Sequence, residues 1–328
     1  MCTAITYKTK AHYFGRTLDY HRSFGEEVVI VPRNFVFSFR KMPKISRHYA
    51  IIGMAAVVDE YPLFYEATNE HGLSMAGLNF PGNAYYKSEI MDLDNIAPFE
   101  LIPWVLSQCA NVEEAIGLMR RMNLVRIHFS EGFCLTPLHW MMADRKRCVV
   151  IESVKEGLKI YENPVGVLTN NPTFDMHMFN LNNYMHLSNE TPGNTFSQNL
   201  DLKVYSLGMG ALGMPGDLSS MSRFVKAAFV RGHSVSGDSE SESISQFFHI
   251  LESVSQPCGC VDIGNKEYEK TIYTSCCNTD RGIYYYTTYE NHQISAIHMH
   301  HENLESETLY CFPLIQGQQI FIQNEKKY

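Results

Sequence analysis

Cysteine at position 2 is the residue of this sequence best placed to act as a nucleophile. Aminopeptidases remove an initiating methionine when the next residue is small, so we expect the mature chain to begin with Cys2. One carbon would then carry a thiol, with a pKa of about 8.5, and an α-amine, with a pKa of about 7.7–8.0. Such an amine is partly neutral near pH 7 and can accept the thiol proton, directly or through a water molecule. The sequence therefore predicts an N-terminal nucleophile, with nucleophile and base on one residue.

Two charged residues follow on a short apolar segment. Arg16 and Asp19 lie three residues apart in the stretch 15–20. A guanidinium near Cys2 would lower the pKa of the thiol and stabilise the thiolate, and a carboxylate would orient the α-amine. The residues alone leave open an ordinary surface pair, which contributes less than ~1 kcal/mol.

Three further polar residues occupy positions that suit acyl transfer. Asn79 and Asn170 each follow an apolar segment at a turn bounded by proline, where amide groups can stabilise an oxyanion. Asparagine beside proline is equally typical of ordinary turns. Arg223 lies near the start of an expected helix, where the helix dipole favours an acid, so we expect this arginine to meet an anion.

Short strands and a few helices must position these residues. Runs of β-branched and aromatic residues predict strands over 3–7, 13–18, 27–31, 49–58, 73–80, 138–144, 148–153, 158–161, 165–169, 271–276, 282–289 and 293–298. Helices are predicted over 98–109, 174–187, 217–231 and 241–255, and from an Asn111 cap with Glu114 as its reciprocal partner. This order indicates an α+β fold in which antiparallel sheets pack together with helices outside, and strand-rich ends suggest that the two termini pair in the core.

Composition narrows the class of protein. The chain has 328 residues with 27 Lys and Arg against 35 Asp and Glu, a formal net charge of −8. A chain of this size folds without disulfides, and its acidic charge argues against nucleic acid or an anionic membrane as the main partner. No apolar stretch reaches the 18 residues of a membrane span. No linker or repeat divides the chain, the Ser-rich stretch 234–245 is expected to be a surface loop, and we predict a single domain over 1–328.

The cysteines and the N-terminus bear on the compartment. Residues 1–7 lack a basic region followed by a long apolar one, so we expect no secretory signal and no propeptide before Cys2. Nine cysteines at irregular spacing are typical of free thiols in a reducing compartment. The protein is therefore predicted to be cytoplasmic.

The segments around these residues resemble the choloylglycine hydrolase family of N-terminal nucleophile amidases, and in particular its conjugated bile salt hydrolases. The matching segments run from end to end: 1–3, 14–19, 76–81, 168–174, 215–224, 282–286 and 288–291. The resemblance implies a four-layer αββα sandwich and hydrolysis of the amide that joins glycine or taurine to a bile acid, as in glycocholate and taurocholate. It also implies a homotetramer, for which exposed apolar residues in 184–196 would serve, and neither cofactor nor metal.

The resemblance carries a catalytic set onto this chain: Cys2, Arg16, Asp19, Asn79, Asn170 and Arg223. The penicillin V acylases share the nucleophile and most of this set but typically carry Tyr at the position of Asn79, which favours bile salts here. In the expected path the Cys2 thiolate attacks the amide carbonyl and water cleaves the thioester. The side chain of Asn170 and the backbone N–H of Asn79 hold the oxyanion.

The steroid requires an apolar concavity in this reading. Residues in loops after strands are expected to line it, namely Leu18, Tyr20, Val58, Tyr65, Phe129 and Phe133, although each is equally compatible with core packing. Arg223 or Asn79 would meet the carboxylate or sulfonate of the substrate.

Two alternatives come from other classes of protein. Cys258 and Cys260, the adjacent Cys276 and Cys277, and the histidines 292, 298, 300 and 301 could be read as a metal or redox cluster. Zinc ligands usually come as cysteines two to four residues apart, which these spacings do not match. A bile-salt-binding protein without turnover is the other alternative.

Overall fold

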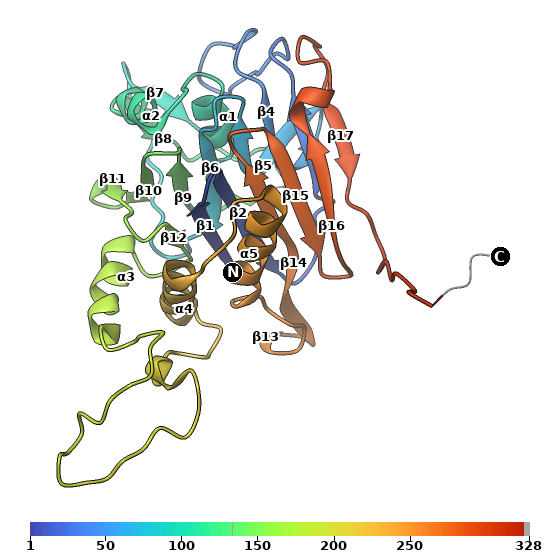
Figure 1. The fold of residues 1–328 in the computed structure, drawn as a ribbon. Coiled ribbons are helices and arrows are strands. Elements are labelled where there is room, and N and C mark those ends of the chain that lie inside the picture. The colour runs from blue at the N-terminus through green and yellow to red at the C-terminus, as the bar shows by residue number, and fades with distance from the viewer. Residues whose placement is uncertain (133, 325–328) are drawn as a thin grey trace.

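Two antiparallel sheets face each other in the computed structural model, which describes residues 1–132 and 134–324 (Figure 1). The seven-stranded sheet has the order β12-β1-β2-β14-β15-β16, with β13 paired to β14. Its strands are β1 Cys2–Lys8, β2 His12–Tyr20, β12 Val167–Leu168, β13 Val261–Gly264, β14 Glu267–Asn278, β15 Ile283–Thr288 and β16 Asn291–His298.

The second sheet has eight strands in the order β11-β10-β9-β6-β5-β4-β3-β17. They are β3 Glu27–Val31, β4 Ile51–Val58, β5 Tyr61–Asn69, β6 Ser74–Asn79, β9 Leu138–Ala143, β10 Cys148–Val154, β11 Gly157–Glu162 and β17 Tyr310–Pro313. A separate parallel pair joins β7 Asp94–Ile96 to β8 Met122–Leu124.

Helices cover the outer face of each sheet, which makes four layers. The helices α4 Ser220–His233 and α5 Glu240–Glu252 lie against the seven-stranded sheet, and α1 Leu101–Leu106 lies against β5 and β6 of the other. The remaining helices are α2 Val112–Met119 and α3 Phe174–Asn180. The predicted αββα sandwich is therefore confirmed. None of the helices in the described residues is long and apolar enough to cross a bilayer.

Burial on both faces explains why the strands read as continuous apolar runs. On β4, Ile52 and Met54 pack between the two sheets, whereas Ile51 and Ala55 pack in the second apolar cluster, with α1. Successive side chains on a strand point to opposite faces, so a strand between two buried layers must be apolar at every position.

Several elements differ from the prediction. The strand patterns miss β5, β7, β8, β13 and β17. β5 contains Pro62 and the charged Glu66, and only its position in the middle of a sheet makes it a strand. The last strand, β17, pairs with β3 at a sheet edge while β1 lies in the other sheet, so the prediction that the two termini pair is wrong.

The helix boundaries also shift, and their caps show why. The helix expected at 217–231 begins at Ser220, because the Asp217 carboxylate accepts from Ser219 N at 2.9 Å and Ser222 Oγ at 2.6 Å and holds that segment in a turn. The helix expected at 174–187 ends at Asn180, and a 3₁₀ turn, Leu181–Tyr184, follows it. The predicted Ser-rich loop ends where α5 begins at Glu240.

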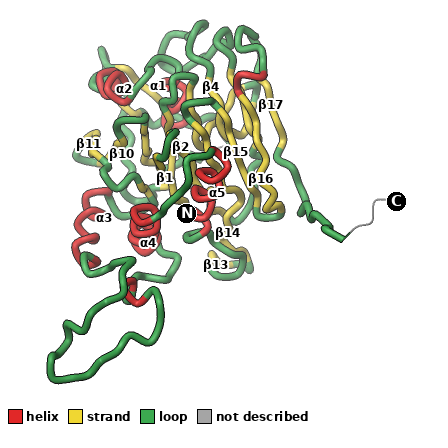
Figure 2. The backbone as a smooth tube through the Cα atoms, viewed as in Figure 1, coloured by secondary structure: helices red, strands yellow, loops and turns green. Residues whose placement is uncertain are grey.

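Other caps follow the prediction. Asn111 Oδ1 accepts from Glu114 N at 3.0 Å, and the Glu114 carboxylate bonds back to Asn111 Nδ2 at 2.7 Å. The helix expected over 98–109 is shorter than predicted, a 3₁₀ turn (Pro98–Glu100) leading into α1. The long connections lie mainly at the sheet ends and between α3 and α4 (Figure 2).

Close approach of β2 to β14 gives a stability prediction. A Cβ at Gly15 would overlap the backbone oxygen of Ser275, so Gly15→Ala must push two core strands apart. We expect it to lower the free energy of unfolding by roughly 2–4 kcal/mol in urea titrations. Gly117→Ala is the matched control, because Gly117 lies on α2 in open space and alanine favours a helix. Equal effects of the two substitutions would contradict the packing argument.

Candidate active site

Strand register places Cys2 in the interior of the sandwich. Cys2 opens β1 opposite Leu18 of β2, and its side chain is 4% exposed. The backbone N–H of Cys2 donates to Asn170 Oδ1 at 2.8 Å. Asn170 follows β12, which is the other neighbour of β1, so the two flanking strands position the first residues of the chain.

Asn170 and Arg223 form a buried cluster around the backbone of Cys2. Arg223 Nη1 donates to Cys2 O and to Thr3 Oγ1, both at 2.6 Å, and Nη2 donates to Asn170 Oδ1 at 2.8 Å. Its Nε donates to Leu218 O at 3.0 Å. Burial lowers the pKa of Arg223, and the charges of Asp19 and Cys2 oppose that effect. The expected anion is therefore absent from these bonds: this arginine, 1% exposed, donates to neutral oxygens of the site.

Arg16 enters the same interior from β2. Its Nη1 donates to Gly77 O at 2.5 Å and to Tyr65 O at 3.3 Å, so it bridges the two sheets. Burial opposes its charge, but Cys2 and other nearby acidic groups raise the pKa of Arg16 above its ordinary value. A cation held this firmly stabilises a thiolate nearby.

The carboxylate of Asp19 accepts hydrogen bonds from two threonine hydroxyl groups. Thr271 Oγ1 donates to its Oδ1 at 2.7 Å, and Thr17 Oγ1 donates to its Oδ2 at 3.1 Å. The Met1 amine donates to Asp19 O at 2.7 Å and forms an ion pair with Glu269. Burial lowers the pKa of this amine, and the charges of Cys2 and Asp19 oppose the effect. Burial at the chain start therefore acts against the charged form of the Met1 amine, whereas the ion pair with Glu269 acts in its favour.

Asn79 ends β6 and turns its backbone toward Asn170. Its carbonyl accepts from Asn170 Nδ2 at 2.8 Å. The next residue, Phe80, donates its N–H to Pro137 O at 2.8 Å, toward the chain that leads into β9. Backbone N–H groups of successive residues in a strand point to opposite sides, so the N–H of Asn79 points away from β9. An amide NH₂ has two donors, and the bond to the Asn79 carbonyl uses one of those of Asn170.

Residues that sequence reasoning missed hold Asn170 from behind. Ser220 Oγ accepts from Asn170 N at 2.8 Å, and His177 Nε2 bonds Asn170 O at 2.8 Å. The His177 ring stacks on Phe224, with centroids 4.6 Å apart. Thr271 and Glu269 were missed as well. No local pattern marks these residues, because only the fold brings them to the site.

The residues expected to line a steroid pocket fall into two groups. Leu18 lies opposite Cys2, and the backbone of Tyr65 bonds Arg16. Val58 and Phe129 instead lie beside Tyr61 at the start of β5, and Tyr20 packs against His21 and Phe24. Phe133 lies outside the described residues.

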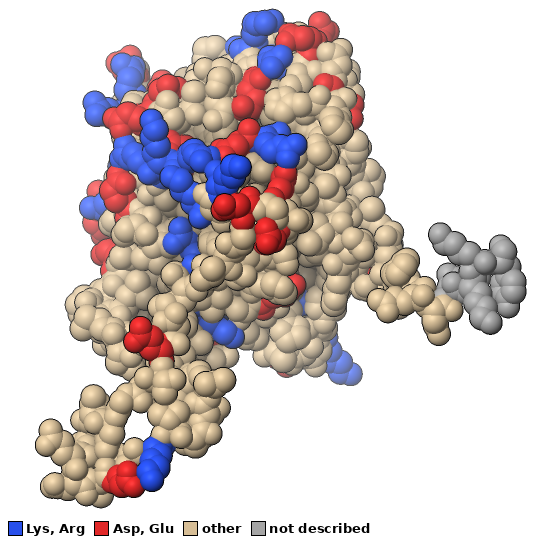
Figure 3. Space-filling view, in the orientation of Figure 1, with Lys and Arg blue, Asp and Glu red and all other residues tan. Residues whose placement is uncertain are grey.

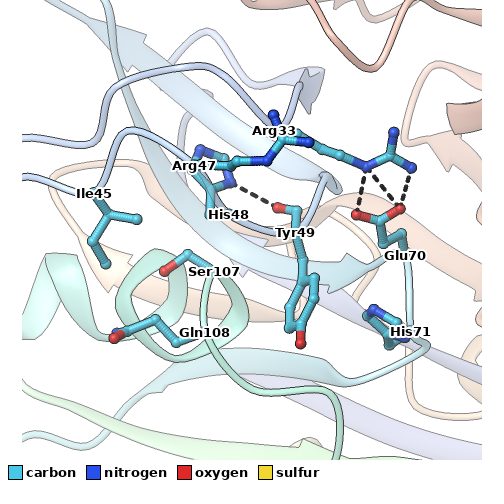
Figure 4. A pocket seen from close by; sticks show the side chains of 9 residues that line it. All are labelled: Arg33, Ile45, Arg47, His48, Tyr49, Glu70, His71, Ser107 and Gln108. Atoms are coloured by element: carbon cyan, nitrogen blue, oxygen red, sulfur yellow. Dashed lines mark hydrogen bonds and ion pairs between the residues drawn. The ribbon is translucent and has the colours of Figure 1, made fainter.

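The pocket drawn in Figure 4 is separate from this cluster. It has a volume of about 630 Å³ and is lined by Arg33, Ile45, Arg47, His48, Tyr49, Glu70, His71, Ser107 and Gln108. Glu70 pairs with Arg33 at 2.5 Å and so already neutralises its charge. A second pocket of about 470 Å³ opens beyond the end of β2, at residues 21–27. Neither contains a residue of the expected catalytic set.

The alternative metal cluster does not assemble in the described part of the chain. There, no group of three or more His, Cys, Asp or Glu side chains could hold a metal ion. Side chains of consecutive strand residues point to opposite faces of the sheet. Cys276 therefore lies on the outer face, near Glu240 of α5, whereas Cys277 lies on the inner face, near Glu66 of the other sheet. His298 and His301 stack on each other, with centroids 4.3 Å apart.

Comparison with known proteins bears directly on this geometry. The model of the linear amide C–N hydrolases, choloylglycine hydrolase family, matches residues 2–312. The chain belongs to this family. It is an enzyme of the class that hydrolyses linear amides, as the resemblance of its motifs implied.

Relatives in the family cover the whole chain. A bile salt hydrolase/transferase of Lactiplantibacillus plantarum is 55% identical over 99% of this chain and 100% of its own length. One from Clostridium perfringens is 39% identical over 95% of this chain and 96% of its own length. A crystal structure of a mutant conjugated bile acid hydrolase from Clostridium perfringens, 37% identical, covers 99% of this chain and 100% of its own with a TM-score of 0.92.

The fold extends beyond close relatives. A penicillin V acylase of Agrobacterium tumefaciens is 20% identical and superimposes with a TM-score of 0.75 over 94% of this chain and 90% of its own. At this identity the likeness concerns the fold alone. The fold alone therefore does not distinguish proteins named for bile acids from one named for penicillin V.

Buried His177 gives a pH prediction. Burial lowers its pKa from 6.5 to about 4, so the unfolded chain takes up this proton first as the pH falls. The contribution of neutral His177 to the free energy of unfolding is therefore complete above pH 6.5 and falls as the pH drops toward 4. At pH 4.5 the loss is about 2–3 kcal/mol. In urea titrations at pH 7 and 4.5, His177→Gln should lose correspondingly less stability on acidification than the wild type. Substitution of the exposed His233 by Gln is the control, and equal acid sensitivity of all three proteins would refute the assignment.

Proposed function

We propose that the chain hydrolyses the amide of glycine- or taurine-conjugated bile salts, with Cys2 as nucleophile after removal of Met1. The observation that carries the proposal is the position of Cys2, which is buried and whose backbone nitrogen bonds Asn170. Two buried arginines belong to the same site: Arg16, and Arg223, which also bonds Asn170. Once Met1 is removed, the nitrogen of Cys2 becomes the α-amine, next to the thiol that it must deprotonate. The catalytic set proposed is Cys2, Arg16, Asp19, Asn79, Asn170 and Arg223.

The proposed reaction is acyl transfer in two steps. The Cys2 thiolate adds to the amide carbonyl, the C–N bond breaks, and the α-ammonium gives its proton to the leaving amine of glycine or taurine. Water then attacks the thioester, which releases the bile acid and returns the thiol. An amine in place of water would form a new amide, and "transferase" is part of the names of the two relatives given above.

The oxyanion of each step is assigned to Asn170 Nδ2 and the backbone N–H of Asn79. The bond between Asn170 and the Asn79 carbonyl keeps these two groups together before substrate arrives, and preorganised donors are the ones that lower a barrier. Bonds from Arg223, Ser220 and His177 restrict Asn170 further.

Bile salts are favoured as substrates over penicillin V by the relatives. The proteins that cover nearly the full chain at 55% and 39% identity are named for bile salts, whereas the penicillin V acylase shares only the fold. Asn79 stands where the acylases typically have Tyr, which agrees with this choice. The nine unpaired cysteines are compatible with the proposed cytoplasmic location.

The nucleophile and the oxyanion donor can be tested separately. We expect Cys2→Ala to abolish turnover of glycocholate. Asn170→Ala should lower kcat by roughly two to three decades, because one oxyanion donor contributes about 2.7–4 kcal/mol. The exposed Asn183→Ala is the matched control and should keep wild-type turnover. Intact-mass spectrometry of each protein must show loss of Met1, and rates on glycocholate, taurocholate and penicillin V identify the substrate class. Full activity with Met1 retained, or penicillin V as the fastest substrate, would refute the proposal.

We also propose that the protein is a homotetramer that uses its long connection between α3 and α4. Residues 185–219, here called the arm, project away from the body of the molecule and carry few charges (Figures 2 and 3). Within the arm Met185, Phe196, Tyr205 and Leu207 are between 81% and 90% exposed. Apolar side chains gathered on one projecting segment are typical of a surface that another protein covers.

The arm can be tested by charge. Phe196→Asp together with Leu207→Asp should shift the native mass, measured by light scattering during size exclusion, from four chains toward smaller species, since a buried unpaired carboxylate is costly. Val235→Asp is the control, because Val235 is 85% exposed but lies outside the arm. A monomeric wild type, or an unchanged mass of the double variant, would contradict the proposal.

A further inference from the structure

A buried carboxylate lies opposite Arg16 in the interior of the sandwich. Glu66 is on β5 of the eight-stranded sheet and is 2% exposed, while Arg16 comes from β2 of the other sheet and is 1% exposed. Glu66 Oε2 lies 3.9 Å from Arg16 Nε. Neither the expected catalytic set nor the proposed reaction uses this carboxylate.

Two tyrosines bind the carboxylate from the seven-stranded sheet. Tyr273 on β14 donates its hydroxyl to Oε2 at 2.7 Å, and Tyr284 on β15 donates to Oε1 at 2.5 Å. Both tyrosines are buried. Each carboxylate oxygen therefore has its own hydroxyl donor, and the arginine stands beside the pair. Bonds of this kind favour the ionised carboxylate over the neutral acid.

The charged and titratable groups around Glu66 come from every neighbouring strand. They are Arg16 on β2, Tyr273 and Cys277 on β14, Tyr284 on β15 and Tyr65 on its own strand. Burial raises the pKa of Glu66 above its ordinary value, and Arg16 and the two tyrosine hydroxyls offset only part of that effect. Burial also raises the pKa of both tyrosines well above the ordinary value, so their hydroxyls keep their protons and remain donors.

Arg16 thus lies between two acidic groups. The Cys2 thiolate raises the pKa of Arg16, and so does Glu66, although burial acts against both. In the described part of the chain, the hydrogen bonds of the guanidinium go to the backbone oxygens of Thr17, Gly77 and Tyr65. A carboxylate on the same cation offsets part of the positive potential that the thiol experiences.

We propose that Glu66 is a positioning residue for Arg16: it holds the guanidinium from the opposite sheet and offsets part of its charge, so that the pair sets how readily the Cys2 thiol ionises. The inference rests on the proposed role of Cys2 as nucleophile. Tyr273 and Tyr284 support it by donating to both oxygens of Glu66, which favours the ionised form. The arrangement leaves the thiol more basic than an unopposed arginine would, and a more basic thiolate is the better nucleophile.

The test is the pH dependence of Cys2 alkylation by iodoacetamide, followed by mass spectrometry on the protein with Met1 removed. Glu66→Gln removes the negative charge and nearly keeps the shape, so the midpoint of alkylation should fall by about one pH unit. At pH 6 the rate of alkylation should rise severalfold, because a larger thiolate fraction outweighs the lower nucleophilicity of each thiolate. Above the midpoint, where the thiol is ionised in both proteins, kcat for glycocholate should fall roughly two- to threefold, because the thiolate is less basic. A general loss of structure would instead expose Cys2, so that alkylation follows the titration of a free thiol, with a pKa of about 8.5, while turnover is lost.

Two tyrosine variants complete the test. Tyr284→Phe removes one donor from Glu66 and should move the midpoint in the same direction by less. Glu66→Gln leaves Arg16 without its buried partner and can for that reason fail to fold. In that case the midpoint measured for Tyr284→Phe decides whether Glu66 has the proposed role. Tyr285→Phe is the matched control: its hydroxyl bonds Glu240 at 2.8 Å, away from Glu66, so the midpoint should stay at the wild-type value.

The possible outcomes separate this inference from the proposed function. An unchanged or raised midpoint in Glu66→Gln, with wild-type Cys2 alkylating normally and glycocholate turned over, would overturn the role of Glu66 and leave the nucleophile intact. A wild-type protein that turns over glycocholate with Cys2 fully alkylated would overturn the nucleophile itself. A lowered midpoint with faster alkylation and slower turnover supports the inference.

Discussion

The hydrogen bond from the backbone nitrogen of Cys2 to Asn170 Oδ1 is the contact on which the rest of the site depends. It joins residues 168 positions apart in the chain, and β1 makes it feasible by pairing with both β2 and β12. Arg223 secures the same oxygen and the carbonyl of Cys2. A nucleophile on the first residues of a chain would otherwise fray, since chain ends keep their conformational freedom unless tied down.

Placing charges inside the sandwich is the cost of this arrangement. Arg16, Arg223, Asp19 and Glu66 are all buried between or beside the sheets, where an unpaired charge is strongly unfavourable. Each is met by oxygens, hydroxyls or an opposite charge: Arg223 by Cys2, Thr3 and Asn170, and Asp19 by two threonines. The same low-dielectric interior strengthens the influence of each charge on the thiol.

The local sequence around each residue explains which parts of the site and of the fold could be predicted and which could not. Arg16, Asp19, Asn79 and Asn170 stood out because polar residues in apolar strands or at turns bounded by proline are conspicuous. Cys2 stood out by its place at the chain start and Arg223 by its place near a helix start, and all six lie in segments that resemble the family. Glu66 did not, because the strand that contains it was not predicted, and Thr271 did not, because threonine is an ordinary strand residue. Similarly, β5 was missed because Pro62 and Glu66 interrupt its pattern, whereas the Asn111 cap could be predicted, since its partner Glu114 is three residues away.

The sequence by itself determined the layered α+β class and the family and singled out Cys2 as the candidate nucleophile, because these depend on short apolar runs and on residues adjacent in the chain. Tertiary structure decided which distant groups meet Cys2 and what charge surrounds it. Arg16 reaches Glu66 only because β2 and β5 lie in facing sheets, and Arg223 turns from an expected anion to the oxygens of Cys2, Thr3 and Asn170 only because α4 lies against β1. Long-range contacts of this kind arise from sheet order and sheet packing, which no local pattern encodes.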